Sequence, residues 1–400
     1  WSVALVVSFT LFYLTYGMWE HRERILVNVA RGVVFQFLAA TGYALLYRPY
    51  VTFRNARYTH IFHTVTITAT YLTIVECAAA VLLLCKLAKS RRLRDFWKEL
   101  VLFGTVSSYM IFTMARTAYF AVGITLLFAL VILAGGKGRE KLKAVGANFL
   151  YLALSVVICL PITFSLQRNI PIIVSDPFLY EIEYSMYCPQ DVMRGRNLGS
   201  KNFMRVGRFI DVFCEKIFGI PEGTFDVYGE IAQYEVSHKE KIERTKKERE
   251  ILLAEMEAAG EEIPEETPPE EDYTNGRIDI FRSYIEQMNA AGHQEMGAVL
   301  DNGEIATHAH NIYLQVAYDH GIFVGIVFAA VGIAAFITSC LYYYRKKDKI
   351  SYAALPAVVT VAVGVAGMVE WIFHLSNPCG FLLLLVITPL LFKDEGLGHE

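Results

Sequence analysis

The stretch Thr307-His308-Ala309-His310-Asn311-Ile312-Tyr313-Leu314-Gln315 is followed by Asp319-His320-Gly321 and by an apolar run that begins at Ile322. It marks the place where a long hydrophilic segment ends and a membrane-spanning segment begins. Two imidazoles and an amide therefore stand directly before a span. An imidazole takes up and releases a proton near neutral pH more readily than other side chains. At this position it would lie at a membrane surface, within reach of a lipid-borne headgroup.

The composition around this stretch is that of a membrane protein. Of the 400 residues 54% are hydrophobic and 19% are charged, and the mean hydropathy is +0.36. These values are too apolar for an ordinary soluble protein, so we expect an all-α polytopic transmembrane helix bundle. The net charge of -3 gives no reason to expect a nucleic-acid partner. Because the chain opens inside an apolar run without an initiator Met, we expect a fragment that could lack earlier helices.

The apolar runs predict where the membrane helices lie, since a span needs about 20 mostly apolar residues. Helices are expected near residues 1–18, 30–47, 61–85, 99–115, 117–134, 145–166, 322–344, 351–373 and 379–392. They divide the chain into three parts. Residues 1–167 hold about six transmembrane helices, and 168–309 form a large extracytoplasmic loop domain. Residues 310–400 form an interfacial helix followed by about three more transmembrane helices.

Lysine and arginine in short loops predict the orientation in the membrane. Basic residues gather in three loops, at 86–98, 137–143 and 345–349. All three fall on one side, which we expect to be the cytoplasm, and the segment 168–309 then faces outside. A fourth loop disagrees, because Arg48, Arg54 and Arg57 would also lie outside. A miscounted early helix therefore stays open as an alternative.

The long outer segment changes composition along its length. Its apolar periodicity predicts a packed helix over residues 202–218. A charged insertion follows at 238–272 and indicates a solvated helix that ends in a flexible acidic linker. An acceptor-binding or regulatory role for this insertion is the alternative. Cys188 and Cys214 both fall in the outer segment, where a disulfide is chemically allowed.

His308 and His310 allow three interpretations. Residues two apart share a face only in an extended segment, so a shared metal would need a loop here and further ligands. The histidines could instead cap the helix that begins after them, or take part in acid-base chemistry or substrate contact. No HExxH pattern supports the metal, and spacing alone does not separate the other two. Asn311, Gln315 and Tyr318 recur at helical spacing and could line a polar pocket, although ordinary interfacial amphipathicity predicts the same pattern.

Three charged residues elsewhere stand out by their surroundings. Arg116 interrupts a long apolar stretch, where a charge is costly and is usually paired or functional. Arg277 follows the acidic insertion and could bind phosphate oxygens or simply form a surface salt bridge. Glu370 ends an apolar helix and could pair with Arg116, orient His310, or be an ordinary interfacial carboxylate.

Three of these segments carry a family resemblance. The pattern His-x-His-Asn-x-Tyr-Leu-Gln at 308–315, with the acidic residue, Gly-Ile and apolar span after it, resembles the signature of the bacterial O-antigen ligase and O-antigen polymerase superfamily. The segment Gly276-Arg277 resembles that family's Gly-Arg segment. Residues 113–118 resemble its Ser-Arg-Gly/Ala turn, with Ala115 where Ser is common. The resemblance implies a GT-C-like glycosyltransferase of the bacterial cytoplasmic membrane. Such an enzyme moves a glycan from an undecaprenyl-diphosphate carrier to an acceptor hydroxyl on the outer side.

The resemblance also implies roles for the residues. Arg116 and Arg277 would hold the carrier diphosphate, and His310, supported by His308, would take the proton of the attacking hydroxyl. The residues that could support the site are Asn311, Gln315 and Glu370. The donor would be a polyprenyl-diphosphate-linked glycan and the acceptor a glycan, a lipid or a protein. No cofactor and no metal would be needed, because arginine neutralises the charge that develops on the leaving group.

Two other functions compete with this one. A transporter or flippase of lipid-linked glycans would also use membrane-facing arginines, and would show internal repeats, which the sequence lacks. A metal-dependent membrane hydrolase would respond to a chelator. Within the family, ligase and polymerase share the same motifs, so the sequence does not separate them.

Overall fold

The computed structural model describes residues 2–19, 24–47, 50, 57–62, 64–174, 206–220, 224, 276–294, 297–370, 372 and 378–392. Within these ranges the chain is almost entirely helical. The strands assigned there are β1 (Ala298–Val299) and β2 (Ile305–Ala306), which pair antiparallel. The expected all-α class is therefore confirmed for the described part of the chain. The insertion at 238–272 and Cys188 lie outside the described residues.

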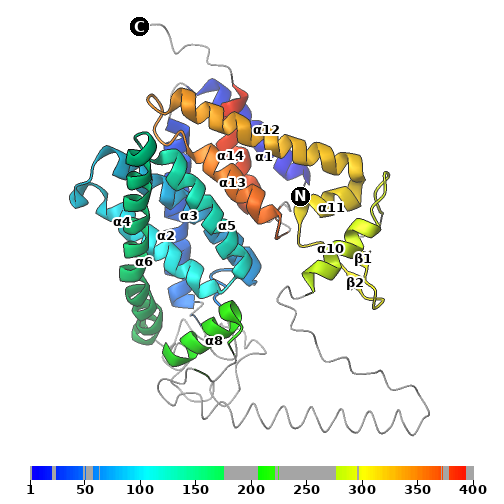
Figure 1. The fold of residues 1–400 in the computed structure, drawn as a ribbon, viewed down its shortest axis with the longest axis horizontal. Helices are drawn as coiled ribbons and strands as arrows, with labels where there is room; N and C mark the ends of the chain where they lie inside the picture. Colours follow the sequence, from blue (N-terminus) through cyan, green and yellow to red (C-terminus); the bar gives the residue numbers. More distant parts are fainter. Residues whose placement is uncertain are drawn as a thin grey trace.

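Six helices form the first part of the bundle: α1 (Ser2–Met18), α2 (Ile25–Tyr47), α3 (Val65–Lys89), α4 (Leu93–Thr113), α5 (Arg116–Leu133) and α6 (Gly138–Val174). The central helix is α3, which is buried along nearly its whole length. It packs against α2, α4, α5 and α13, and α6 covers α4 (Figure 1). Close approach of α6 to α4 depends on Gly104, where a Cβ would lie 2.4 Å from the carbonyl oxygen of Ser155.

The C-terminal part adds α11 (Ile312–His320), α12 (Ile322–Lys346), α13 (Leu355–Gly367), α14 (Pro378–Ile387) and the 3-10 helix η4 (Thr388–Leu391). Among the described residues, α2, α3, α5, α6 and α12 are long and apolar enough to cross a membrane. The helices α1, α13 and α14 are apolar but shorter. A helix forms at each of the nine expected positions. The expected length of 351–373 is wrong, because α13 ends at Gly367 and Glu370 lies in the turn after it.

The two ends of the bundle differ in charge. The C-terminal ends of α3 and α12 meet the start of α13 around one small cavity, whose lining includes Lys86 and Lys349. The Nη1 atom of Arg91 donates a hydrogen bond of 2.7 Å to Oδ1 of Asn148, near the start of α6. The three basic loops therefore lie at one end. The N-terminal ends of α3 and α5 and the C-terminal end of α13 lie at the other end.

Shorter elements cover this second end. Helix α8 (Val206–Phe218) places the ring of Phe209 5.7 Å from Phe112 and 5.5 Å from Phe164, measured between centroids. It matches the packed helix expected at 202–218 over its described residues. Helix α10 (Arg277–Glu286), the β-hairpin and α11 form a small lobe beside the bundle (Figure 1). The core of this lobe consists of Tyr284, Ala298, Ala309 and Tyr318.

Candidate functional site

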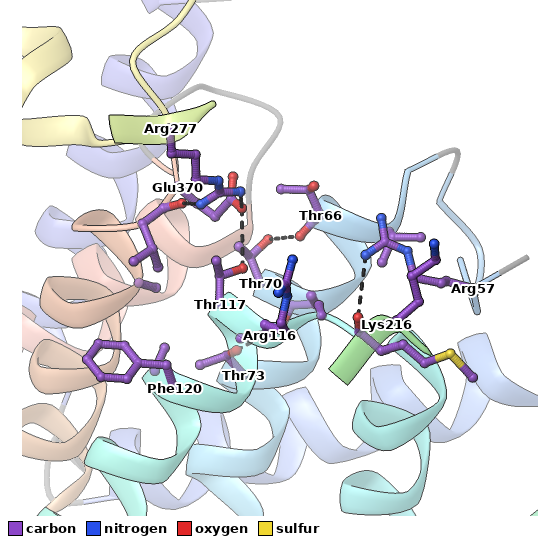
Figure 2. A pocket seen from close by; sticks show the side chains of 18 of the residues that line it. Arg57, Thr66, Thr70, Thr73, Arg116, Thr117, Phe120, Lys216, Arg277 and Glu370 are labelled. Carbon is purple, nitrogen blue, oxygen red and sulfur yellow. Dashed lines mark hydrogen bonds and ion pairs between the residues drawn. The ribbon is translucent and has the colours of Figure 1, made fainter. Parts of the chain in front are cut away.

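A cavity of about 1150 Å³ opens at the end of the bundle opposite the basic loops. Its walls come from α3, α5, α8, α10, the end of α13 and the loop that carries Arg57 (Figure 2). Arg116 and Arg277 both line it, so the structure brings together two arginines that are far apart in the sequence. The α3 wall is polar, because Thr66, Thr70 and Thr73 all line the cavity.

Arg116 reaches the cavity from the first turn of α5. The turn before it forms because Met114 adopts a left-handed conformation with φ of 48° and Ala115 is extended. No side chain caps the start of α5. Figure 2 shows the guanidinium extending between the α3 threonines and Arg57. Among the described residues, the structure gives the side chain of Arg116 no hydrogen bond and no ion pair.

Arg57 is a third arginine of this cavity, and the sequence motifs did not identify it. Its neighbour Tyr58 is buried and donates a backbone hydrogen bond of 3.0 Å to the carbonyl of Phe112, which anchors the loop. The Nη1 atom of Arg57 donates to the carbonyl of Met114 at 3.4 Å. Burial lowers the pKa of Arg57 from its ordinary value, and the nearby charge of Arg116 lowers it further. The one feature of the sequence that could have pointed to Arg57 was its basic loop, which disagreed with the predicted orientation.

Arg277 is held by Glu370. Gly276, with φ of 74°, starts α10 so that Arg277 is its first residue. The Nη2 atom of Arg277 lies 2.8 Å from Oε1 of Glu370, and Nη1 donates to the carbonyl of Val369 at 2.5 Å. Burial raises the pKa of Glu370, but hydrogen bonds from His310 and Arg277 and the charges of both outweigh burial and leave it below the ordinary value. Thr117 Oγ1 also donates to Oε1, at 3.4 Å.

His310 contacts the same carboxylate from the other side. Its Nδ1 atom lies 3.4 Å from Oε2 of Glu370, and its backbone is left-handed with φ of 47°. The contact depends on close packing of α11 against α13: a Cβ on Gly367 would lie 2.7 Å from Cγ2 of Ile312. Neither histidine is among the residues that line the cavity. The sequence suggested that Glu370 could orient His310 or pair with Arg116. In the structure Glu370 contacts His310, and its arginine partner is Arg277 instead of Arg116.

The ring of His308 lies beside that of His310, tilted by 56°, with 4.2 Å between ring centroids. Its Nδ1 atom lies 3.0 Å from Oγ1 of Thr307. Burial lowers the pKa of His308, and the charges of His310 and Arg277 lower it further, whereas the charge of Glu370 raises it. The net effect is a pKa below the ordinary value, which favours the neutral imidazole.

Asn311 and Gln315 shape the backbone around His310. Asn311 caps α11, since its side-chain oxygen accepts hydrogen bonds from the amides of Tyr313 at 2.9 Å and Leu314 at 3.1 Å. Gln315 is buried, accepts from the amide of Ala309 at 2.7 Å and donates to Asp319 at 2.9 Å. Neither lines the cavity. Their observed contacts therefore support the turn that carries the two histidines.

Glu76 is a buried carboxyl one turn below Thr73 on α3. Ser107 Oγ donates to its Oε1 atom at 2.6 Å, and Glu76 is 3% exposed. A single acidic residue within an apolar span is a signal of function, and sequence reasoning did not use it here.

The charges of the cavity are unbalanced. Its described lining holds four cationic side chains, Arg57, Arg116, Lys216 and Arg277, and two carboxylates, Glu215 and Glu370. Each carboxylate already has a cationic partner. Lys216 Nζ lies 2.8 Å from Glu215 Oε1, and Glu370 is paired with Arg277. The arrangement favours an anionic ligand. Among the described residues, no group of three or more His, Cys, Asp or Glu side chains is placed to hold a metal ion.

Comparisons with known proteins leave the family open. No protein-family model matches the chain, and no curated protein and no solved structure is significantly similar to it.

Proposed function

We propose that this chain is a GT-C-like membrane glycosyltransferase, similar to O-antigen ligases and polymerases. It would move a glycan from a polyprenyl-diphosphate carrier to an acceptor hydroxyl. The observation that carries the proposal is the shared cavity of Arg116 and Arg277, with Glu370 joining Arg277 to His310. It combines a place for an anionic leaving group with an imidazole held by a carboxylate.

The positions of the two arginines support an anionic ligand. Arg116 is the first residue of α5 and Arg277 the first of α10. The N-terminal end of a helix carries partial positive charge, so a cation there is unfavourable and an anion is favourable. Both helix ends contribute lining residues to the cavity. The negative charge of a diphosphate would offset the unfavourable position of each arginine at a helix N-terminus. Its oxygens would also match the planar donor groups of the guanidinium side chains.

The observed ion pairs suggest that the three arginines have different roles in the proposed complex. Arg277 is already paired with Glu370, whereas Arg57 and Arg116 have no carboxylate partner among the described residues. In the proposed complex, Arg57 and Arg116 make the main contacts with the diphosphate. Arg277 borders the same anion and connects it through Glu370 to His310.

The reaction then follows from the chemistry of the side chains. The acceptor oxygen forms a bond to the anomeric carbon of the glycan and gives its proton to Nε2 of His310. The bond between that carbon and the diphosphate oxygen breaks, and the diphosphate leaves on its lipid. Glu370 accepts a hydrogen bond from the Nδ1–H group of His310 and so keeps Nε2 available, in the way that a carboxylate orients the histidine of a catalytic triad.

The proposed placement in the membrane follows the charge of the two bundle ends. The basic loops would face the cytoplasm, and the cavity, α8 and the small lobe would face outside a bacterial cytoplasmic membrane. The supporting feature is that the cavity lies at the end opposite those loops.

The test is transfer from a purified polyprenyl-diphosphate glycan to an added acceptor in reconstituted vesicles. His310→Ala should lose most transfer, and His320→Ala is the matched control, because His320 ends helix α11, which begins two residues after His310, and does not line the cavity. Full activity of His310→Ala would contradict the general-base role. Inhibition of the wild type by a chelator would favour a metal-dependent hydrolase. Movement of intact donor across the vesicle without transfer would favour a flippase.

A further inference from the structure

A second cavity lies at the basic end of the bundle, away from the proposed transfer site. Its volume is about 460 Å³, and it lies between the C-terminal ends of α3 and α12 and the start of α13. Four lysines line it, Lys86, Lys89, Lys347 and Lys349, against one carboxylate, Asp348. None of the four is in an ion pair with a carboxylate in the described ranges. The cavity is therefore cationic, because its four lysines outnumber its one carboxylate.

The wall that carries Lys347 and Lys349 is an ordered turn. The amide of Lys347 donates to the carbonyl of Tyr343 at 2.8 Å, and the amide of Ile350 donates to that of Lys346 at 2.8 Å. The hydroxyl of Tyr343 donates to the carbonyl of Ile132 at 3.1 Å and so ties α12 to α5. These bonds hold the lysines of the turn opposite those at the end of α3. The concentration of charge is thus built into the fold.

The start of α13 adds to the positive potential. Ala353 and Ala354 line the cavity, and no side chain caps the helix that begins at Leu355. A helix of this length directs partial positive charge from its first amides toward the cavity. The amide of Leu355 already donates to the carbonyl of Tyr352 at 2.8 Å, so the helix contributes through its dipole, and the lysine ammonium groups are the donors for phosphate oxygens.

We propose that this cavity binds a phosphate group, supplied by the headgroup of an anionic phospholipid. The lipid source follows from the level of the site along the bundle. Val131 on α5 and Ile337 and Leu341 on α12 lie toward the C-terminal ends of these helices. Their side chains are exposed, as expected of lipid-facing positions. Tyr343 and Tyr352 line the cavity itself, and tyrosine is typical of the membrane interface. Basic pockets between membrane helices at this level bind anionic headgroups.

The competing explanation is that these lysines only set the orientation of the helices. Basic loops need no ligand for that purpose, and Lys98, Lys137, Lys141 and Lys143 belong to the same end without lining the cavity. The two explanations differ in one respect. If the cavity binds a headgroup, lipid binding depends on the four lysines that line it. If the protein is only attracted to an anionic surface, lipid binding depends equally on the cavity lysines and on the four lysines outside the cavity.

The experiment measures binding of dioctanoyl-phosphatidylglycerol to the full chain in an uncharged detergent. Dioctanoyl-phosphatidylcholine and inorganic phosphate are separate arms, and apparent melting temperatures report folding. One variant carries Lys→Gln at 86, 89, 347 and 349, and the control carries Lys→Gln at 98, 137, 141 and 143. The cavity variant should bind phosphatidylglycerol at least about tenfold more weakly than the wild type, and the control within about threefold.

Each outcome decides the proposal. Binding of phosphatidylglycerol above phosphatidylcholine, lost only in the cavity variant, supports a lipid headgroup. Equal binding of inorganic phosphate, lost in the same variant, supports the phosphate site with a soluble source. Absence of binding, or an equal loss in both variants, overturns the site. If the fourfold cavity variant does not fold, Lys89→Gln combined with Lys349→Gln replaces it, with Lys98→Gln combined with Lys141→Gln as its control.

Discussion

The proposed site predicts that Arg116 and Arg277 act on stability in different ways. Removing Arg277 leaves the carboxylate of Glu370, 8% exposed, without its closest cation. Breaking a fully buried pair costs about 3–5 kcal/mol and an exposed pair about 0–1 kcal/mol. The Arg277 side chain is 24% exposed, so Arg277→Gln should cost about 2 kcal/mol. Arg116 has no such partner in the described structure.

Arg116→Gln should leave the free protein as stable as the wild type or slightly more stable. A cation at a helix N-terminus is unfavourable by about 0.3–1 kcal/mol, and Arg57 adds repulsion from the same cavity. Loss of contacts by the arginine stem offsets part of that gain. The two substitutions should therefore differ by about 2 kcal/mol in stability although both impair donor binding.

The assay is the apparent melting temperature in detergent, with and without a short-chain prenyl diphosphate. A ligand present at about 100 times its Kd stabilises the folded state by about 2.7 kcal/mol. Arg116→Gln should keep the basal melting temperature and lose this ligand-induced increase, and Arg277→Gln should lower the basal value. Arg139→Gln is the matched control, since Arg139 lies in the first turn of α6 at the opposite end. A full ligand-induced increase in Arg116→Gln, or an equal basal loss in both variants, would refute the reasoning.

Three further predictions use other residues. His310→Ala should reduce transfer on the order of 10²- to 10⁴-fold and His308→Ala less, measured in the reconstituted transfer assay; equal losses would point to a shared metal. The pKa of Glu370 is lowered in the folded protein, so its ionised form adds stability that is complete above the ordinary value of about 4.3 and is lost as pH falls below it. The difference in melting temperature between wild type and Glu370→Gln should therefore shrink in acid, and a constant difference would contradict the ion pairs. An impermeant thiol reagent on intact cells should label Asn302→Cys and spare Lys346→Cys, and the reverse pattern would invert the orientation.

The helices were predictable because apolar length decides them, whereas their ends depend on tertiary contacts. Hydropathy continues past Gly367, and a helix over 351–373 was the natural expectation. The structure ends α13 at Gly367, where Ile312 packs against it and Tyr313 Oη donates to the carbonyl of Gly364 at 3.0 Å. This early end is what turns Glu370 toward Arg277 and His310. No local pattern in the sequence shows that α11 would lie against this glycine face.

The candidate site was predictable to the extent that local motifs carried it. Arg116 and Arg277 were expected to converge, and both line the cavity. Arg57 was missed because it belongs to no motif and lies on a loop whose position depends on burial of Tyr58. Its charge nevertheless contradicted the predicted orientation. Under the proposed orientation, the anion site accounts for a basic residue on the outer side, and a miscounted helix is not needed to explain it.

Under the proposed function, Glu370 couples donor binding to the histidine. Its carboxylate is shared unequally, with Arg277 at 2.8 Å and His310 at 3.4 Å. A diphosphate in the cavity would compete with Glu370 for the Arg277 guanidinium, because both ligands use the same donors. As Arg277 turns toward the diphosphate, the carboxylate loses a cationic partner and its interaction with His310 strengthens. Binding of the donor would then orient the base, so that proton removal from the acceptor becomes effective only when a leaving group is in place.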